Sequence, residues 1–151
     1  MTKKIFSKNK KAYHDYKVIQ TYEGGLSLLG QEVKSIKEGS ASLKEGFVLI
    51  ENSEVWLWNC HVPRYRFSSD RAYDPIRKRK ILMKRSEIDT LTGKTKEKNL
   101  TLIPLSLYGI KGIIKIEIGL CQGLKKYDKR KRLKERDLKK DLQKDKRKYM
   151  V

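Results

Sequence analysis

Apolar and polar residues alternate regularly in one segment near the end of the apolar part of the chain. There Ile114, Ile116 and Ile118 alternate with Lys115 and Glu117. Successive side chains of a β-strand point to opposite faces, whereas the apolar residues of a helix recur every three or four positions. The segment therefore predicts a strand with one buried face.

Three longer segments also favour strands. Residues 47–51 and 54–60 are rich in β-branched and aromatic residues, and Asn52-Ser53 between them predicts a hairpin turn. Residues 100–108 contain Pro104. Because proline has no amide donor, we expect this strand to lie at a sheet edge or to contain a bulge.

Two short helices are expected between the strands. Residues 31–38 place apolar side chains on one helical face, and Gly39 suits the left-handed position after the last turn. Ser86 is the expected cap of a second helix, which Gly93 weakens or ends early.

The predicted fold class is mainly β. Residues 16–23, ended by Gly24-Gly25, and residues 26–29 add weaker strand candidates. Five or six short strands with two or three short helices favour a small oligonucleotide-binding-type β-barrel, although periodicity alone does not separate a barrel from a sandwich.

Charge divides the chain into three predicted parts. Residues 1–12 contain lysines and no acidic residue, and predict a flexible basic N-terminal arm. Residues 13–123 hold nearly all the apolar residues and are the expected barrel domain. Residues 124–151 form a basic tail with too few apolar residues for a core, so we expect it to be disordered when free.

The net charge is strongly positive. The 151 residues include 37 Lys and Arg against 18 Asp and Glu, a formal charge of +19. Nucleic acid is the commonest partner of such a chain, and an anionic membrane is second. The sequence has no apolar stretch near the roughly 18 residues that span a bilayer and no signal-peptide pattern at its start. We therefore expect a cytoplasmic, RNA-binding protein.

Catalysis is not predicted. The cysteines Cys60 and Cys121 and the histidines His14 and His61 show no metal-ligand spacing. Cys60 and His61 are neighbours on an expected strand, so their side chains should point to opposite faces. No enzyme, metal site or cofactor is expected.

A dense basic cluster surrounds one short apolar segment. Arg77 to Lys80 precede Ile81-Leu82-Met83, and Lys84-Arg85 follow. Such a cluster favours phosphate contact over mere solubility, while the alternative is a solvated loop leading into a core strand. Some aromatic residues are candidates for stacking on unpaired bases while others fill the core: Tyr13, Tyr16, Tyr22, Tyr65, Phe67 and Tyr73.

The tail carries much of the charge. Residues 125–148 contain 14 Lys or Arg and 5 Asp or Glu, a net +9. A helical register places Leu138, Leu142 and Tyr149 on one side. An isolated helix of this kind is marginal, so we expect it to form against RNA. The alternative is a tail that is always disordered.

Five segments resemble, in order, the motifs of the SsrA-binding protein family. They are Asn9–Tyr16, Gly30–Ile36, Asp74–Met83, Leu102–Tyr108 and Gly123–Arg130. The resemblance implies a β-barrel that binds the tRNA-like domain of transfer-messenger RNA. It also implies entry with that RNA into ribosomes stalled without a usable stop codon, where trans-translation tags the nascent chain.

The resemblance also assigns residues. Positions Asn9, Glu23 and Leu82 match the family's RNA-binding surface, and the tail is expected to become helical in the decoding centre and empty messenger channel of the ribosome. Lys84 stands where His or Asn is common, and Leu124 replaces a usual Lys. The resemblance therefore does not assign the contacts that Lys84 and Leu124 make.

Charge and resemblance together give the predicted sites. The RNA-binding residues are Asn9, Lys10, Lys11, His14, Glu23, Lys34, Arg77, Arg79, Lys80, Leu82, Lys84 and Arg85. The ribosome-contacting tail residues are Gly123, Lys125, Lys126, Tyr127, Asp128, Lys129, Arg130, Leu138 and Leu142. The expected partners are transfer-messenger RNA and the ribosome, with no membrane or small-molecule substrate, and the protein is expected to be a monomer. The alternatives are a general RNA-binding or ribosome-associated barrel protein and, less favoured, an RNA-processing enzyme.

Overall fold

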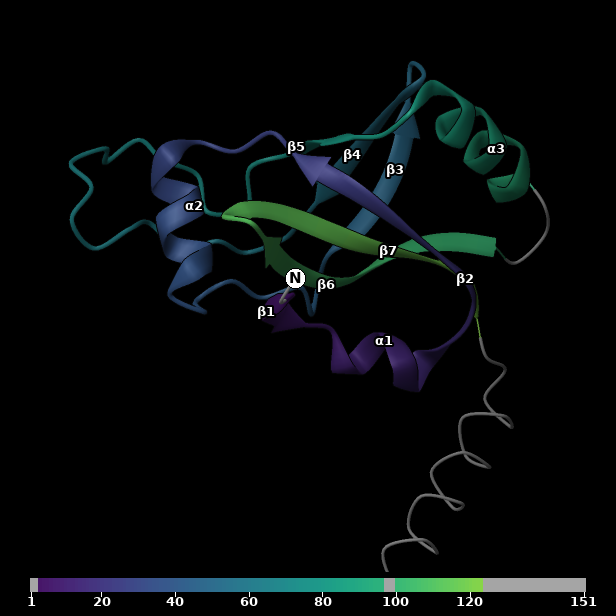
Figure 1. Ribbon diagram of the computed structural model, residues 1–151, viewed down its shortest axis with the longest axis horizontal. Helices are drawn as coiled ribbons and strands as arrows, with labels where there is room; N and C mark the ends of the chain where they lie inside the picture. The colour runs from purple at the N-terminus through teal and green to yellow at the C-terminus, as the bar shows by residue number, and fades with distance from the viewer. Residues whose placement is uncertain (1–2, 97–99, 124–151) are drawn as a thin grey trace, which may run out of the picture.

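The computed structural model describes residues 3–96 and 100–123, and these residues confirm the mainly β prediction (Figure 1). The elements in chain order are β1 (Lys4–Lys8), α1 (Lys10–Asp15), β2 (Tyr16–Leu26), α2 (Gly30–Lys37), β3 (Phe47–Glu51), β4 (Glu54–Trp58), β5 (Arg79–Leu82), α3 (Arg85–Thr95), β6 (Leu100–Ile110) and β7 (Ile113–Gly123). Within the described residues no helix is long and apolar enough to cross a membrane.

The strands form one antiparallel sheet whose pairings close into a ring. The order is β1-β6-β3-β4-β5-β2-β7, and β7 also pairs with β6. The long β2–β7 and β6–β7 pairings hold one side of this ring, whereas β3 and β6 meet only at Val48 and Leu102. The helices α2 and α3 lie at opposite ends of the sheet (Figure 1).

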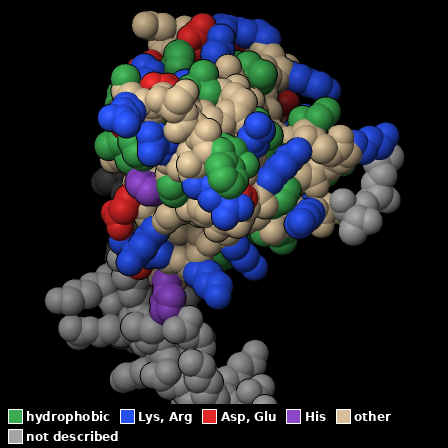
Figure 2. Space-filling view, turned by 90° about the vertical axis from the view of Figure 1, so that its left-hand side faces the viewer, with side chains coloured by type: hydrophobic (Ala, Val, Ile, Leu, Met, Phe, Trp, Pro, Cys, Tyr) green, Lys and Arg blue, Asp and Glu red, His purple; other side chains and the backbone are tan. Residues whose placement is uncertain are grey.

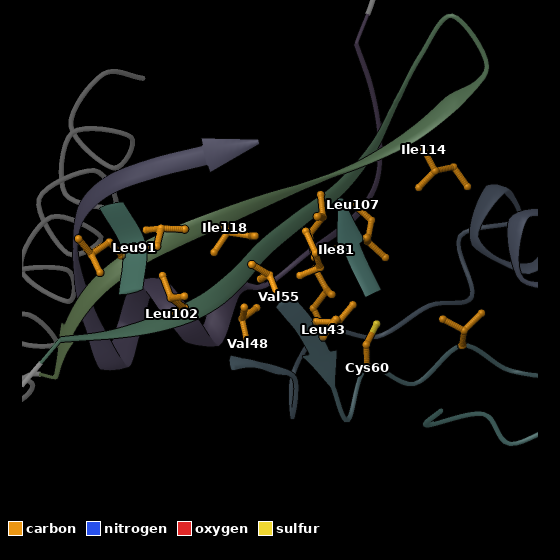
Figure 3. Packing of buried hydrophobic residues seen from close by; sticks show 14 of the residues in the cluster. Leu43, Val48, Val55, Cys60, Ile81, Leu91, Leu102, Leu107, Ile114 and Ile118 are labelled. Atoms are coloured by element: carbon orange, nitrogen blue, oxygen red, sulfur yellow. The ribbon is translucent and has the colours of Figure 1, made fainter. Parts of the chain in front are cut away.

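The main core lies inside this ring. Val55 and Leu57 from β4 belong to one cluster with Ile81 from β5 and with Ile116 and Ile118 from β7, each at most 1% exposed. Figure 3 shows Val55, Ile81 and Ile118 of this cluster. The alternation predicted for residues 113–118 is thus confirmed, because the isoleucines at even positions are buried and Lys115 and Glu117 are partly exposed. Burial of this apolar surface supplies most of the favourable free energy of folding.

The predicted turn at Asn52-Ser53 and a second turn between β6 and β7 have the backbone that tight hairpins require. Asn52 and Ser53 both have positive φ angles, 50° and 65°, and join Glu51 to Glu54. Lys111 and Gly112, with φ of 52° and 77°, join β6 to β7. Positive φ at both central residues matches the right-handed twist of the flanking strands.

The bulge expected at Pro104 is present. The register of β6 against β7 shifts between Pro104 and Ser106. The carbonyl of Pro104 accepts a hydrogen bond of 2.9 Å from the side-chain amide of Asn9, and the backbone N–H of Asn9 donates to Leu105 at 2.8 Å. The bulge therefore anchors the start of α1.

The prediction that β2 ends before Gly24-Gly25 is wrong. The strand continues through both glycines to Leu26, so residues 26–29 form no separate strand. A Cβ at position 24 would lie 2.6 Å from Cγ2 of Ile81. Glycine is required here because β5 and its neighbours approach closely, not because the strand ends.

The two predicted helices are confirmed with changed ends. In α2 the side chain of Glu32 accepts the N–H of Leu29 at 2.8 Å, and Gly39 has the expected positive φ of 80°. The helix α3 begins at Arg85, with Lys84 rather than Ser86 at its cap position, and it continues past Gly93 to Thr95. The predicted cap at Ser86 is therefore wrong.

The N-terminal arm is also corrected. Residues 4–8 form β1, which pairs with β6, and residues 10–15 form α1, which the sequence reading missed. The lysines of β1 are exposed, but the side chain of Phe6 packs against the core. The segment is therefore held by its strand pairing with β6 and by the buried part of Phe6. The predicted tail residues from Lys125 onward lie outside the described residues; Gly123 is the last residue of β7.

Candidate RNA-binding interface

Three predicted RNA-binding residues, Glu23, Leu82 and Lys84, line one groove. The groove has a volume of about 520 Å³, and Lys115 of β7 contributes to its wall. Sheet register explains the placement, because Gly25 of β2 pairs with Leu82 of β5 on one side and with Lys115 on the other. Leu82 is 52% exposed, an unusual position for a leucine at the end of a strand whose neighbour Ile81 is buried.

The carboxylate of Glu23 is oriented by the buried side chain of Tyr108. The hydroxyl of Tyr108 donates a hydrogen bond to Oε2 of Glu23. Burial first, and then this hydrogen bond and the charge of Glu23, raise the pKa of Tyr108 far above its ordinary value, so the phenol remains a donor. Lys3 lies 4.0 Å from the centre of the Tyr108 ring and 3.5 Å from Glu117. The second oxygen of Glu23 is left to accept from a ligand.

The groove combines chemistry that suits a nucleotide. A carboxylate accepts from base amino groups or a ribose 2′-hydroxyl, an exposed leucine packs against a ribose or base face, and lysines neutralise phosphates. Glu23, Leu82 and the pair Lys84 and Lys115 supply these groups in one place. The groove contains no nucleophile–base pair, and the described residues hold no cluster of His, Cys, Asp and Glu that fits a metal ion.

Asn9 is placed differently from the prediction. Its side chain is buried, accepts the N–H of Ala12 as the cap of α1, and donates to the carbonyls of Leu43 and Pro104. Its polar atoms are therefore engaged inside the protein. The neighbouring Lys10 and Lys11 are exposed, and His14 is half-buried.

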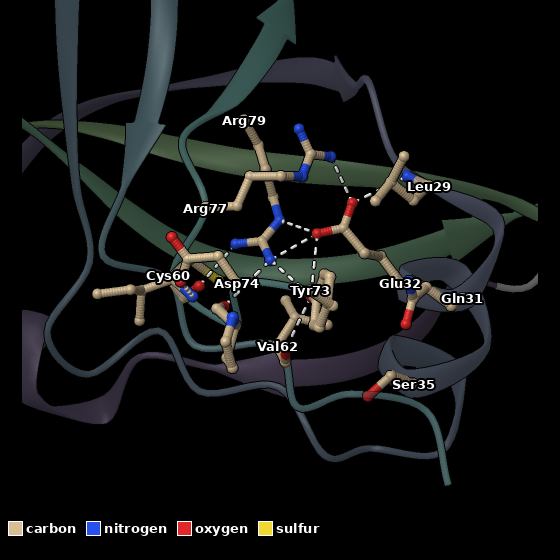
Figure 4. A network of polar contacts seen from close by, with 12 residues as sticks. Leu29, Gln31, Glu32, Ser35, Cys60, Val62, Tyr73, Asp74, Arg77 and Arg79 are labelled. Carbon is tan, nitrogen blue, oxygen red and sulfur yellow. Dashed lines mark hydrogen bonds and ion pairs between the residues drawn. The ribbon is translucent and has the colours of Figure 1, made fainter. Parts of the chain in front are cut away.

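Arg79 is the clearest correction. The prediction placed it on an RNA-contacting surface, but it is 0% exposed. Its Nε and Nη2 atoms lie 2.6 Å from Oε2 of Glu32, and its guanidinium also donates to the carbonyls of Cys60 and Pro75 (Figure 4). Every face of this guanidinium is used by the protein, so Arg79 is part of the folded core.

Glu32 is the centre of this buried network. Its carboxylate accepts hydrogen bonds from Arg77, from Arg79 and from the backbone of Leu29, and the hydroxyl of Tyr73 lies 3.1 Å away. Burial acts to raise the pKa of Glu32, but the hydrogen bond from Arg77, the backbone bond and the charge of Arg79 outweigh it, and the pKa is lowered. Burial raises the pKa of Tyr73 to about 12, so its hydroxyl stays protonated.

The remaining basic residues of the cluster are partly engaged. Lys78 pairs with Glu51 at 2.9 Å and lies 4.2 Å from the centre of the Trp56 ring. Lys80 pairs with Glu54 at 3.2 Å. These pairs are exposed enough to be weak, so a phosphate can compete for both lysines. Lys34, Lys84 and Arg85 are exposed, the last beside Asp89 at 3.3 Å.

The sequence reading missed the roles of Glu32 and Tyr108. A signal for Arg79 was present, because it precedes the core residue Ile81 by two positions and so shares its face of the strand. A buried arginine at that position requires a buried carboxylate nearby. Nothing in the local sequence identifies Glu32 as that partner, since 47 residues separate the two.

Comparison with known proteins decides the family. A model of the SmpB protein family matches residues 6–148. The chain belongs to the SmpB family. It is 46% identical over 144 residues to the SsrA-binding protein of Sulfurihydrogenibium sp. (strain YO3AOP1), with 95% of each chain covered, and 48% identical over 141 residues to that of Persephonella marina (strain DSM 14350 / EX-H1), with 93% of each covered.

Structural comparison agrees with this SmpB assignment. The fold matches a solved chain described as "tmRNA-SmpB: a journey to the center of the bacterial ribosome" with a TM-score of 0.67 and 39% sequence identity. The match covers 79% of this SmpB chain and 84% of the other.

Proposed function

We propose that this SmpB chain binds the tRNA-like domain of transfer-messenger RNA in the cytoplasm and delivers it to stalled ribosomes for trans-translation. The observation that carries the proposal is the groove in which Glu23, Leu82 and Lys84 meet, in a chain of this family. The relatives are named for SsrA binding, and the matched structure is described by tmRNA and the bacterial ribosome.

Each groove residue has a separate task in this proposal. Glu23, held by Tyr108, accepts a hydrogen bond from a base or ribose, which selects orientation. Leu82 covers a ribose or base face, and Lys84 with Lys115 neutralises backbone phosphates. The protein acts by binding and delivery, and no group in the groove is assigned a catalytic step. Asn9 acts indirectly, because its hydrogen bonds set the position of α1 and its two lysines.

The basic tail is proposed to occupy the decoding centre and the empty messenger channel as a helix. Its net charge of +9 over residues 125–148 supports this, since a vacant messenger channel is walled by anionic RNA. The sites proposed there are Gly123, Lys125, Lys126, Tyr127, Asp128, Lys129, Arg130, Leu138 and Leu142.

Recovery of bound RNA from cells tests the partner. Sequencing should show one dominant tRNA-like RNA with the full-length protein, and that enrichment should fall for Lys84→Ala. Lys17→Ala is the matched control, because Lys17 is exposed on β2 and lies six residues before Glu23, roughly 20 Å away at about 3.3 Å per residue. A broad mixture of RNAs from the unaltered protein would favour a general RNA-binding function instead.

Truncation after Gly123 tests the tail. The shortened protein keeps every described strand and should still bind transfer-messenger RNA, but it should not support tagging on stalled ribosomes. Leu138→Pro should reproduce much of this defect without removing charge, because proline inside a helix costs about 3 kcal/mol. Normal tagging by the proline variant would leave charge alone as the basis of tail function.

A further inference from the structure

A long loop between β4 and β5 carries an exposed aromatic cluster. Residues 59–78 have no regular secondary structure apart from one bridge at His61, and they extend beyond α2 at the end of the molecule far from α3 (Figure 1). At the tip of this loop Phe67 is 73% exposed, the highest value among the large hydrophobic residues described. We call Tyr65, Arg66 and Phe67 the tip cluster.

The members of the tip cluster are held against one another. The rings of Tyr65 and Phe67 lie 5.5 Å apart, edge to face at 70°. The guanidinium of Arg66 lies 4.9 Å from the centre of the Phe67 ring, and Nζ of Lys34 lies 5.4 Å from that of Tyr65. A single exposed ring is common on protein surfaces, but two rings in contact, each with its own cation, form an ordered surface.

Contacts with α2 fix the loop that presents this cluster. Ser35 donates to the carbonyl of Pro63 at 2.8 Å, and Arg66 pairs with Glu38 at 3.4 Å. At the base of the loop the buried carboxylate of Glu32 binds Arg79, and Tyr73 lies 2.8 Å from the carbonyl of Val62. Because the chain is already ordered, a ligand that stacks on Phe67 loses little affinity to ordering of the loop.

Charge around the tip cluster favours a polyanion. The loop adds Arg64 and Arg71, both exposed, to Arg66. The face that carries α2 and this loop shows many Lys and Arg side chains around hydrophobic ones and few acidic side chains (Figure 2). Aromatic rings interleaved with cations are the surface on which unpaired RNA bases stack while their phosphates are neutralised.

The loop is also continuous with the groove. It leads directly into β5, whose last residue is Leu82, and Lys78, Lys80 and Lys84 follow along that path. A single RNA chain can therefore follow cations from the groove toward the loop.

We infer that the tip cluster is a base-stacking subsite for an unpaired segment of the same RNA that the groove binds. Phe67 and Tyr65 receive one base, and Arg66 contacts its phosphate. The inference rests on the proposed function for the identity of that RNA.

Phe67→Ala in the full-length protein tests the subsite. Its affinity for the tRNA-like domain of transfer-messenger RNA should fall about 5-fold or more, because stacking of one base contributes about 1–3 kcal/mol by alanine substitution. Phe67→Tyr should keep the affinity of the unaltered protein because it keeps an aromatic ring. Phe67→Leu should lose affinity because leucine has no ring. The midpoint of thermal unfolding should stay unchanged in all three, since the ring is outside the core.

Arg66→Gln and a short oligoadenylate complete the test. Arg66→Gln should lower the logarithmic salt slope of binding by roughly 0.7–0.9, whereas Phe67→Ala should leave that slope unchanged. The affinity of oligoadenylate for the unaltered protein should be higher than its affinity for the Phe67→Ala variant. Equal affinity of Phe67→Ala and the unaltered protein for both RNAs would overturn the subsite. The unaltered protein could bind transfer-messenger RNA no more tightly than an unrelated RNA while Phe67→Ala still lowers its affinity for oligoadenylate. That result would overturn the proposed function but support the stacking subsite.

Discussion

The role of a single basic side chain in this domain cannot be inferred from the charge of its neighbours in the sequence. Arg77 to Lys80 read as one surface cluster, yet the structure divides them. Arg79 points inward with Ile81, because alternation along the strand outweighs the charge of the neighbours. The sequence identifies the cluster, but only the three-dimensional pairing with Glu32 shows which arginine is structural.

Replacement of Glu32 tests the buried network. Glu32→Gln should lower the free energy of unfolding by about 3–5 kcal/mol, because it leaves the charge of Arg79 buried without its partner. Glu54→Gln is the matched control, since its partner Lys80 is half-exposed and such pairs contribute about 0–1 kcal/mol. Urea unfolding measures both. Similar losses in the two variants would show that burial does not strengthen the Glu32 interaction.

The lowered pKa of Glu32 sets a direction for acid sensitivity. A carboxylate whose folded pKa lies below its unfolded value stabilises the fold above the unfolded value, near 4.3, and this stabilisation is lost as pH falls through the folded pKa. The free energy of unfolding should therefore decrease as pH drops below the ordinary glutamate range. The decrease should be smaller in Glu32→Gln, which has no such proton to bind, when urea midpoints are compared between pH 7 and pH 3.

At the scale of elements, most strands and two helices could be predicted, and the misses have physical causes. Residues 4–8 lack regular alternation and look like a charged arm, but β6 offers an edge on which they pair. The helix α1 has six residues, too few for a clear apolar period, and Asn9 fixes it through contacts with carbonyls 34 and 95 positions away. Long-range pairing of this kind leaves no local signal.

Gly24 tests whether close approach, rather than chain flexibility, explains the glycine in β2. Gly24→Ala should reduce the free energy of unfolding by about 1–3 kcal/mol, because the added Cβ would lie 2.6 Å from Ile81 and force the core to shift. Gly30→Ala is the control, since nothing lies within 4 Å of its Cβ position at the start of α2. Thermal unfolding of both variants decides the point, and an undisturbed Gly24→Ala protein would contradict the packing explanation.

At the scale of the whole molecule, charge should govern the strength of RNA binding. With a formal charge of +19, the protein should bind transfer-messenger RNA with a steep dependence on salt. If about five phosphates are neutralised, the slope of log affinity against log salt should be roughly −3.5 to −4.5, at −0.7 to −0.9 per contact. Fluorescence titrations between about 50 and 200 mM salt measure this slope. A flat response would contradict the role given to the basic surface.

The double pairing of β7 affects how a copy of this protein is made. The strand spans Ile113–Gly123 and is hydrogen-bonded to both β2 and β6. A chain whose synthesis stops before residue 113 therefore has β2 and β6 edges that lack their β7 partner, and such edges invite aggregation. Folding of the domain must wait until β7 has been synthesised. A protein proposed to act on interrupted synthesis is thus one whose own interrupted copies lack the strand that joins β2 to β6.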